Sequence, residues 1–169
     1  SREGKKGKAG AHNSITLLIG DIVDVEVTNK DEEGVHVKAV DTGAIGYIPA
    51  SHLSDYDALC AQLMEAIPTA GSEGSVAFRM SALVVEHERS RSRYLLSMKR
   101  SLVTAAKEEE LPSNLSELQP QQFVQGFVKN VTDFGCFVAF LNGLTALAPK
   151  NSLADCFVSS PADYYTVGQ

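Results

Sequence analysis

Apolar and polar residues alternate with a period of two along the first part of the chain. In the run that contains Val25 and Val27 the intervening positions are acidic or polar, and the next run alternates around His36. Because successive side chains of a strand point to opposite faces, this period predicts half-buried strands. Pro49 ends the third run, since proline cannot donate a hydrogen bond to a sheet. The three predicted strands cover residues 20–28, 35–39 and 44–48.

The spacing of apolar residues becomes helical after Pro49 and then returns to that of strands. Leu53, Leu59 and Leu63 predict a helical connector over residues 51–67, which ends near Pro68. Two further strands are expected at residues 76–85 and 94–99, with the charged turn 86–92 between them. Three strands, a helix and two strands are the order of a five-stranded OB-type β-barrel.

The opening pattern begins again beyond residue 122. Four residues recur at an offset of 100, and Gly34 and Val37 recur at an offset of 101 as Gly135 and Val138. The four are Gly43, Pro49, Leu53 and Asp55, which become Gly143, Pro149, Leu153 and Asp155. Such internal repetition predicts two copies of one fold. The second copy shows strands one to three and the start of the connector, so its strand edges are expected to be unpaired.

The predicted fold class is therefore all-β: tandem five-stranded OB-fold barrels with a short helical connector, the second barrel truncated at its C-terminus. The expected organisation is a flexible basic tail over residues 1–17 and a first repeat over 18–103. A linker over 104–120 precedes the incomplete second repeat, which covers 121–169 with strands one to three.

Charge is distributed unevenly along the chain, whose net charge is -6. Residues 20–55 contain eight acidic and two basic residues, whereas residues 74–103 contain six basic and two acidic ones. The net negative charge argues against a protein that binds nucleic acid over its whole surface, but one positive face is compatible with this charge. The three cysteines form no CxxC pair, which favours a reducing compartment. No apolar run reaches the roughly 20 residues that span a bilayer.

Several motifs of the second repeat carry a family resemblance. They are Gly126-x-Val128, Phe134-Gly135-Cys136-Phe137-Val138 and Gly143-Leu144, and the first repeat closes with Tyr94-Leu95-Leu96-Ser97-Met98-Lys99. In this combination the chain resembles the S1 RNA-binding domain family. The run from Gly143 to Pro149, followed by Leu153-Ala154-Asp155, is similar to repeats of the large eukaryotic multi-S1 proteins of ribosomal RNA processing. This resemblance implies a nucleolar protein that binds single-stranded RNA of the ribosomal RNA precursor and works with preribosomal proteins.

The resemblance also implies where RNA is bound. It places Lys129, Phe134 and Phe137 on a barrel face where bases stack on aromatic rings. For each ring the alternative is a structural role, as a cap on the barrel core. Ala146 stands where many S1 domains have a histidine on the third strand.

The first repeat departs further from the family pattern. Glu33 and His36 stand where the second repeat has Phe134 and Phe137. An acid at a stacking position repels phosphate, so the second repeat is expected to bind RNA and the first weakly or not at all. His36 could stack or form a hydrogen bond, or be a surface residue without a role. The remaining candidates for phosphate contacts, whose alternative is a solvated surface charge, are Arg79, Arg91, Arg93, Lys99 and Arg100.

Enzyme functions find little support in the sequence. It contains neither a GxxxxGK[ST] nor a GxGxxG loop. The four histidines are scattered without metal-ligand spacing. We therefore expect no catalytic residues, metal, cofactor, small-molecule substrate or membrane partner. The alternative to an RNA-binding scaffold is a protein-interaction module, in which degenerate S1 barrels dock on preribosomal proteins.

Overall fold

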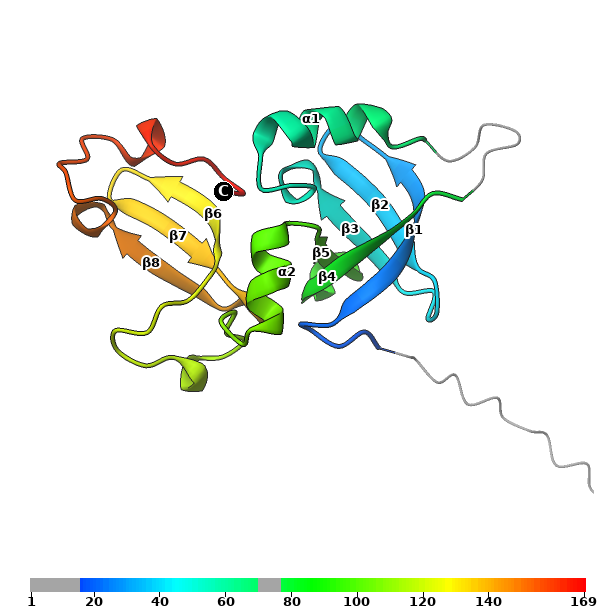
Figure 1. Cartoon of the computed structure of the whole chain (residues 1–169), viewed down its shortest axis with the longest axis horizontal. Helices are drawn as coiled ribbons and strands as arrows, with labels where there is room; N and C mark the ends of the chain where they lie inside the picture. Colours follow the sequence, from blue (N-terminus) through cyan, green and yellow to red (C-terminus); the bar gives the residue numbers. More distant parts are fainter. Residues whose placement is uncertain (1–15, 70–76) are drawn as a thin grey trace, which may run out of the picture.

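The computed structural model describes residues 16–69 and 77–169, in which most of the regular secondary structure is β-strand (Figure 1). The first repeat forms a closed barrel with the strand order β1-β2-β3-β5-β4. Its strands are β1 (Ile22–Lys30), β2 (Gly34–Ala39), β3 (Ile45–Pro49), β4 (Arg79–Glu88) and β5 (Arg93–Ser97). The 3₁₀ turn η1 (Ala50–His52) and the helix α1 (Asp57–Ala66) lie between β3 and β4. The predicted OB-type fold class is thereby confirmed.

The barrel closes where β3 pairs with β5 in parallel, whereas all its other strand pairs are antiparallel. The interior side chains come from alternate positions, as the period of two requires. Val25, Val35, Ile48 and Val84 are completely buried. Burial of each such side chain contributes about 1.5–3 kcal/mol, so this core stabilises the first repeat. Leu17, which the sequence placed in the tail, also belongs to this core and is 7% exposed.

The second repeat forms a three-stranded antiparallel sheet with the order β6-β7-β8. Its strands are β6 (Phe127–Thr132), β7 (Gly135–Ala139) and β8 (Thr145–Pro149), and a 3₁₀ turn, η5 (Lys150–Ser152), follows β8 as η1 follows β3. The register shifts between Val27 and Asn29 in β1, and likewise between Val128 and Asn130 in β6. Residues that are 101 positions apart in the sequence therefore occupy equivalent positions in the two repeats, and this equivalence includes the β-bulge.

Gly34 and Gly135 begin the second strand of each repeat and lie against the end of the third. A Cβ atom at Gly34 would be 2.4 Å from the carbonyl oxygen of Ile48, and one at Gly135 would be 2.3 Å from that of Ala148. Only glycine permits so close an approach of two backbones. The repeated glycine therefore reflects packing of the chain against itself.

The correspondence between the repeats extends to the last residue of the chain. In the first repeat the backbone N–H of Val27 donates to the carbonyl of Phe78, just before β4 (2.9 Å). In the second, the N–H of Val128 donates to the carbonyl of Gln169 (2.8 Å). Gln169 thus pairs with β6 as Phe78 pairs with β1.

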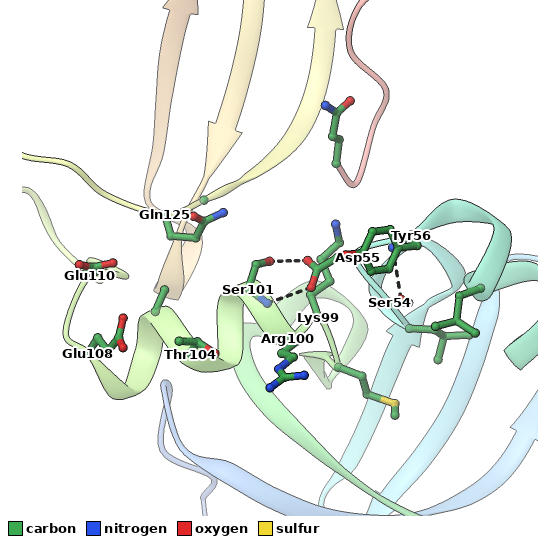
Figure 2. Close-up of a pocket in the computed structure, with 16 residues that line it drawn as sticks. Ser54, Asp55, Tyr56, Lys99, Arg100, Ser101, Thr104, Glu108, Glu110 and Gln125 are labelled. Atoms are coloured by element: carbon green, nitrogen blue, oxygen red, sulfur yellow. Dashed lines mark hydrogen bonds between the residues drawn. The ribbon is translucent and has the colours of Figure 1, made fainter.

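The helix α2 (Arg100–Lys107) joins the two repeats and lies between them (Figure 1). It begins at Arg100, before the linker expected from residue 104. Its first turn is held by Asp55, whose carboxylate accepts hydrogen bonds from the backbone N–H of Ser101 (2.9 Å) and from the Ser101 hydroxyl (Figure 2). A carboxylate at a helix start satisfies free N–H groups and interacts favourably with the helix dipole.

A second apolar cluster joins the two repeats into one packed unit. Leu83 and Val85 from the outer face of β4 meet Leu102 and Ala105 of α2. The second repeat contributes Phe127, Ala139, Phe140 and Leu141, and the segment between the repeats contributes Leu111. Leu111 is 6% exposed although it lies in the expected linker. The segment between the repeats therefore takes part in the core.

Candidate nucleic-acid interface

The three residues expected to bind RNA in the second repeat lie on neighbouring strands. The bulge in β6 leaves Lys129 unpaired between Val128 and Asn130, and its side chain is exposed. Phe137 of β7 pairs with Asn130, directly beside that bulge. Phe134 precedes β7 and is 57% exposed. The structure therefore brings a cation and two aromatic rings to one end of the sheet.

The two rings are held in a defined arrangement. The centroids of Phe134 and Phe137 are 6.1 Å apart and the ring planes are inclined by 89°. This edge-to-face contact is a favoured geometry for aromatic pairs. The turn behind it is closed by the Thr132 hydroxyl, which donates to the carbonyl of Gly135 (2.9 Å). An exposed ring supported from one side can stack on an unpaired base.

The Phe134 ring also borders a hollow of about 660 Å³, to which sequence reasoning did not assign a role. Phe157 lines this hollow and is 85% exposed, and the Nζ atom of Lys150 lies 6.0 Å from its ring centroid. The signal available in the sequence was an aromatic residue within a polar connector. Phe157 and Lys150 extend the ring-and-cation surface beyond the three expected residues.

The equivalent surface of the first repeat is built differently. Glu33 is exposed just before β2, and the His36 ring packs on Tyr47 with a centroid distance of 4.9 Å. The Nε2 atom of His36 lies 2.7 Å from the carboxylate of Asp31. This hydrogen bond from His36 lowers the pKa of Asp31 below its ordinary value. Glu33 and the engaged His36 thus occupy the places of Phe134 and Phe137, and a second carboxylate, that of Asp31, lies beside His36.

Arg93 lies on the same face of the first repeat and is already engaged. Its guanidinium carbon is 4.0 Å from the ring centroid of Tyr47, and its Nε atom is 2.6 Å from the carboxylate of Glu88. Burial, with the charge of Asp31 nearby, raises the pKa of Tyr47 to about 12, so Tyr47 remains a neutral phenol. The charge of Arg93 is balanced within the protein, which leaves it less available for phosphate.

The other basic candidates lie apart from one another. Arg79, at the start of β4, forms an exposed ion pair with Glu26 (3.5 Å). Arg91 is exposed in the turn between β4 and β5. Lys99 was expected at the end of the fifth strand, but β5 ends at Ser97 and Lys99 is 5% exposed. Because Lys99 is buried at the start of α2, it does not lie on an open sheet face.

A polar cleft of about 880 Å³ separates part of the first repeat from the second, and Figure 2 shows the residues that line it. Lys99 and Arg100 line one part of it with Asp55, and Glu108 and Glu110 line another. Acidic and basic groups therefore both face the cleft. With three acidic and two basic residues lining it, the cleft does not favour an RNA backbone, since phosphates require an excess of cations.

His52 is buried beneath the junction of the repeats and is 4% exposed. Its Nδ1 atom is 2.8 Å from the Ser97 hydroxyl oxygen, and its ring lies edge-to-face on Phe127 with a centroid distance of 4.6 Å. Burial, reinforced by the charge of Lys99, lowers the pKa of His52 to about 4. His52 is therefore neutral at physiological pH and packs between the two repeats.

This environment predicts a pH dependence of stability. Between pH 6.5, the ordinary pKa of histidine, and about pH 4, the unfolded chain binds a proton at His52 that the folded chain does not. Stability should therefore fall as the pH falls through this window, by at most roughly 1.4 kcal/mol per pH unit. Urea unfolding at pH 7 and pH 5 checks this: the wild type should lose more stability than His52→Gln. Equal losses in the two proteins would contradict the assignment.

No grouping of three or more histidine, cysteine or acidic side chains suited to a metal ion occurs within residues 16–69 and 77–169. Across the same ranges, no helix has both the length and the apolar character that crossing a membrane demands.

Comparisons with known proteins point to one family. The model of the S1 RNA binding domain matches residues 17–99 and 117–169. The chain is 35% identical to the human protein "Protein RRP5 homolog" over 98% of its length, and 34% identical over 88% to the Schizosaccharomyces pombe "rRNA biogenesis protein rrp5". It spans about 8% of the length of each of these relatives. A Bacillus subtilis homologue of the small ribosomal subunit protein bS1 is 29% identical over 88% of the chain, which covers 35% of that protein.

Two structural repeats, one of them a closed OB-type barrel, coincide with the two matched segments. Phe134 and Phe137, which belong to the S1 motifs of the second repeat, contact each other beside its β6–β7 turn. On this sequence and structural basis the chain belongs to the S1 RNA binding domain family.

Proposed function

We propose that this chain binds single-stranded RNA as a non-enzymatic scaffold segment, chiefly through its second repeat. The observation that carries the proposal is the pair of accessible rings, Phe134 and Phe137, next to the exposed Lys129. Stacking on such rings is worth about 1–3 kcal/mol per base, and a cation beside them can neutralise a phosphate. Unpaired bases can reach these rings, whereas the bases of a duplex are already stacked on one another.

The similarity to two proteins whose names refer to RRP5, one of them an "rRNA biogenesis protein", supports a role in ribosomal RNA processing. The RNA would then be a ribosomal RNA precursor, and preribosomal proteins would be the partners of the larger assembly. Such work would take place in the nucleolus.

The first repeat offers a second candidate function, as a surface for protein docking. Its β1–β2 turn carries Glu33 where the second repeat carries Phe134, with Asp31 nearby, and its Arg93 is paired with Glu88. A surface on which the charges are paired internally has little to offer an RNA backbone. Preribosomal proteins are accordingly the partners that we propose for this face.

Titration of the whole chain with a fluorescently labelled single-stranded RNA tests the proposal. Binding should be measurable at low salt and should weaken as salt rises, because phosphate contacts release counterions. The same RNA annealed to its complement should bind more weakly, since its bases are stacked in the duplex. Equal affinity for both forms, or no binding at low salt, would contradict base stacking on the second repeat.

A further inference from the structure

A groove of about 430 Å³ runs along the junction of the two repeats, apart from the polar cleft of Figure 2. One wall is the end of β4 and the turn after it, residues 86–90. The other wall includes Lys129 of β6. The groove is also lined by three largely apolar positions, namely Leu95, Phe127 and Ala139. The groove therefore touches the second repeat at a residue that belongs to the proposed RNA surface.

The groove presents two cations that the protein itself does not pair. Arg89 on the first repeat and Lys129 on the second are both exposed. Within the described parts of the chain, neither side chain takes part in a salt bridge or hydrogen bond. Of the two acidic residues in the groove, Glu88 is paired with Arg93. The carboxylate of Glu86 lies close to the backbone of Gly143: a Cβ atom added to Gly143 would be 3.0 Å from the Oε1 atom of Glu86.

His87 lines the groove, but its ring lies on the barrel side of β4. The exposed ring of His87 is stacked on Tyr94, with a centroid distance of 4.4 Å and planes inclined by 13°. Tyr94 is buried in the barrel core, so it supports the histidine from beneath. Tyr94 faces the barrel core whereas Leu95 lines the groove, so the groove is defined by its cations and apolar positions and not by this ring.

The two walls of the groove are also fixed relative to each other. The apolar cluster that joins the repeats includes Val85, directly before the groove residues of β4, and both Phe127 and Ala139 of its second wall. A groove that exists before the ligand arrives requires no ordering of its walls on binding, which favours affinity.

We propose that one strand of RNA passes through this groove and contacts both repeats at once. Its phosphates would meet Arg89 and Lys129. This inference rests on the proposed function and adds a path that continues from Lys129 onto the first repeat. The first repeat would thus contribute through its β4–β5 turn, although the charges on its own sheet face are paired internally.

The test uses the whole chain and two single-stranded RNAs, of about 5 and about 20 nucleotides. The first is near the lower limit of the roughly 4–16 nucleotides that one OB fold covers, and the second is longer than the upper limit. Arg89→Ala should weaken binding of the long RNA and leave the short one unaffected, because the short RNA occupies the Phe134 surface alone. The plot of log affinity against log salt for the long RNA should become shallower by about 0.7, the value of one phosphate contact with a single strand. Lys129→Ala should weaken binding of both RNAs.

Lys107→Ala is the matched control, since Lys107 is exposed on α2 outside the groove. If Arg89→Ala binds the long RNA with the affinity and salt dependence of Lys107→Ala, the path through the groove is wrong. Failure of the wild-type chain to bind even the short RNA would instead overturn the proposed function. The two failures are therefore distinguishable in one series of titrations.

Discussion

Replacement of Phe127 by alanine is expected to lower the free energy of unfolding by about 3–5 kcal/mol, as is typical of a phenylalanine removed from a core. Phe127 is 8% exposed and belongs to the apolar cluster that joins β4 and α2 to the second repeat. Its ring also contacts His52 of the first repeat. The cavity left behind would therefore open between the repeats, where the surrounding side chains come from several elements.

Urea denaturation followed by circular dichroism measures this effect. Phe123→Ala is the matched control, because the Phe123 side chain is 94% exposed and its removal should change stability little. We also expect the wild type to unfold in one transition, since the repeats share a core. Equal stability of the two variants would show that the contact between the repeats contributes nothing.

Replacement of Phe134 by alanine is expected to weaken binding of single-stranded RNA by about 1–3 kcal/mol, or roughly 5- to 160-fold in affinity. Its ring is 57% exposed, so removing it should cost little stability while a stacked base loses its partner. Phe137→Ala should act in the same direction, because the two rings support each other. Fluorescence anisotropy with a labelled RNA gives the affinities.

Two further variants test the prediction for Phe134→Ala more closely. Phe123→Ala removes an even more exposed ring from outside the surface and should leave RNA affinity unchanged. Glu33→Phe places a ring at the equivalent position of the first repeat and removes a negative charge, so it should strengthen binding. If Phe134→Ala matched Phe123→Ala in RNA affinity, the ring would have no stacking role.

Much of the fold could be predicted because its signals are local. The alternation around Val25 and Val27, and the recurrence of Gly34 and Pro49 as Gly135 and Pro149, correspond to strands and strand ends in the structure. The valines follow the two-residue period of a strand, and the repeated glycine allows a close contact between two backbone segments. Such features leave a pattern in the sequence that does not depend on distant partners.

The packing of the two repeats could not be predicted because it depends on distant residues. Leu83 and Val85 belong to one apolar run with Val84, yet Val84 faces the barrel core while the other two face the second repeat. A run that is apolar on both sides indicates burial but not the partner of each face. The start of α2 depends likewise on Asp55, which is 46 residues away from Ser101.

The candidate site was predicted only in part for a similar reason. The resemblance led to Lys129, Phe134 and Phe137, which do lie on adjacent parts of one sheet. It could not reveal that Arg93 is engaged by Glu88 and Tyr47, because these contacts form only in the folded barrel. It also could not reveal the burial of Lys99, which follows from the end of β5 at Ser97.

Photo-crosslinking of the whole chain to a single-stranded RNA that contains 4-thiouridine, with the crosslinked residues identified by mass spectrometry, tests the central claim most directly. Binding by the second repeat predicts crosslinks at Phe134 and Phe137 and few or none around Glu33. Crosslinks concentrated on the β2–β3 face of the first repeat, or an absence of crosslinks from the Phe134 surface, would contradict it.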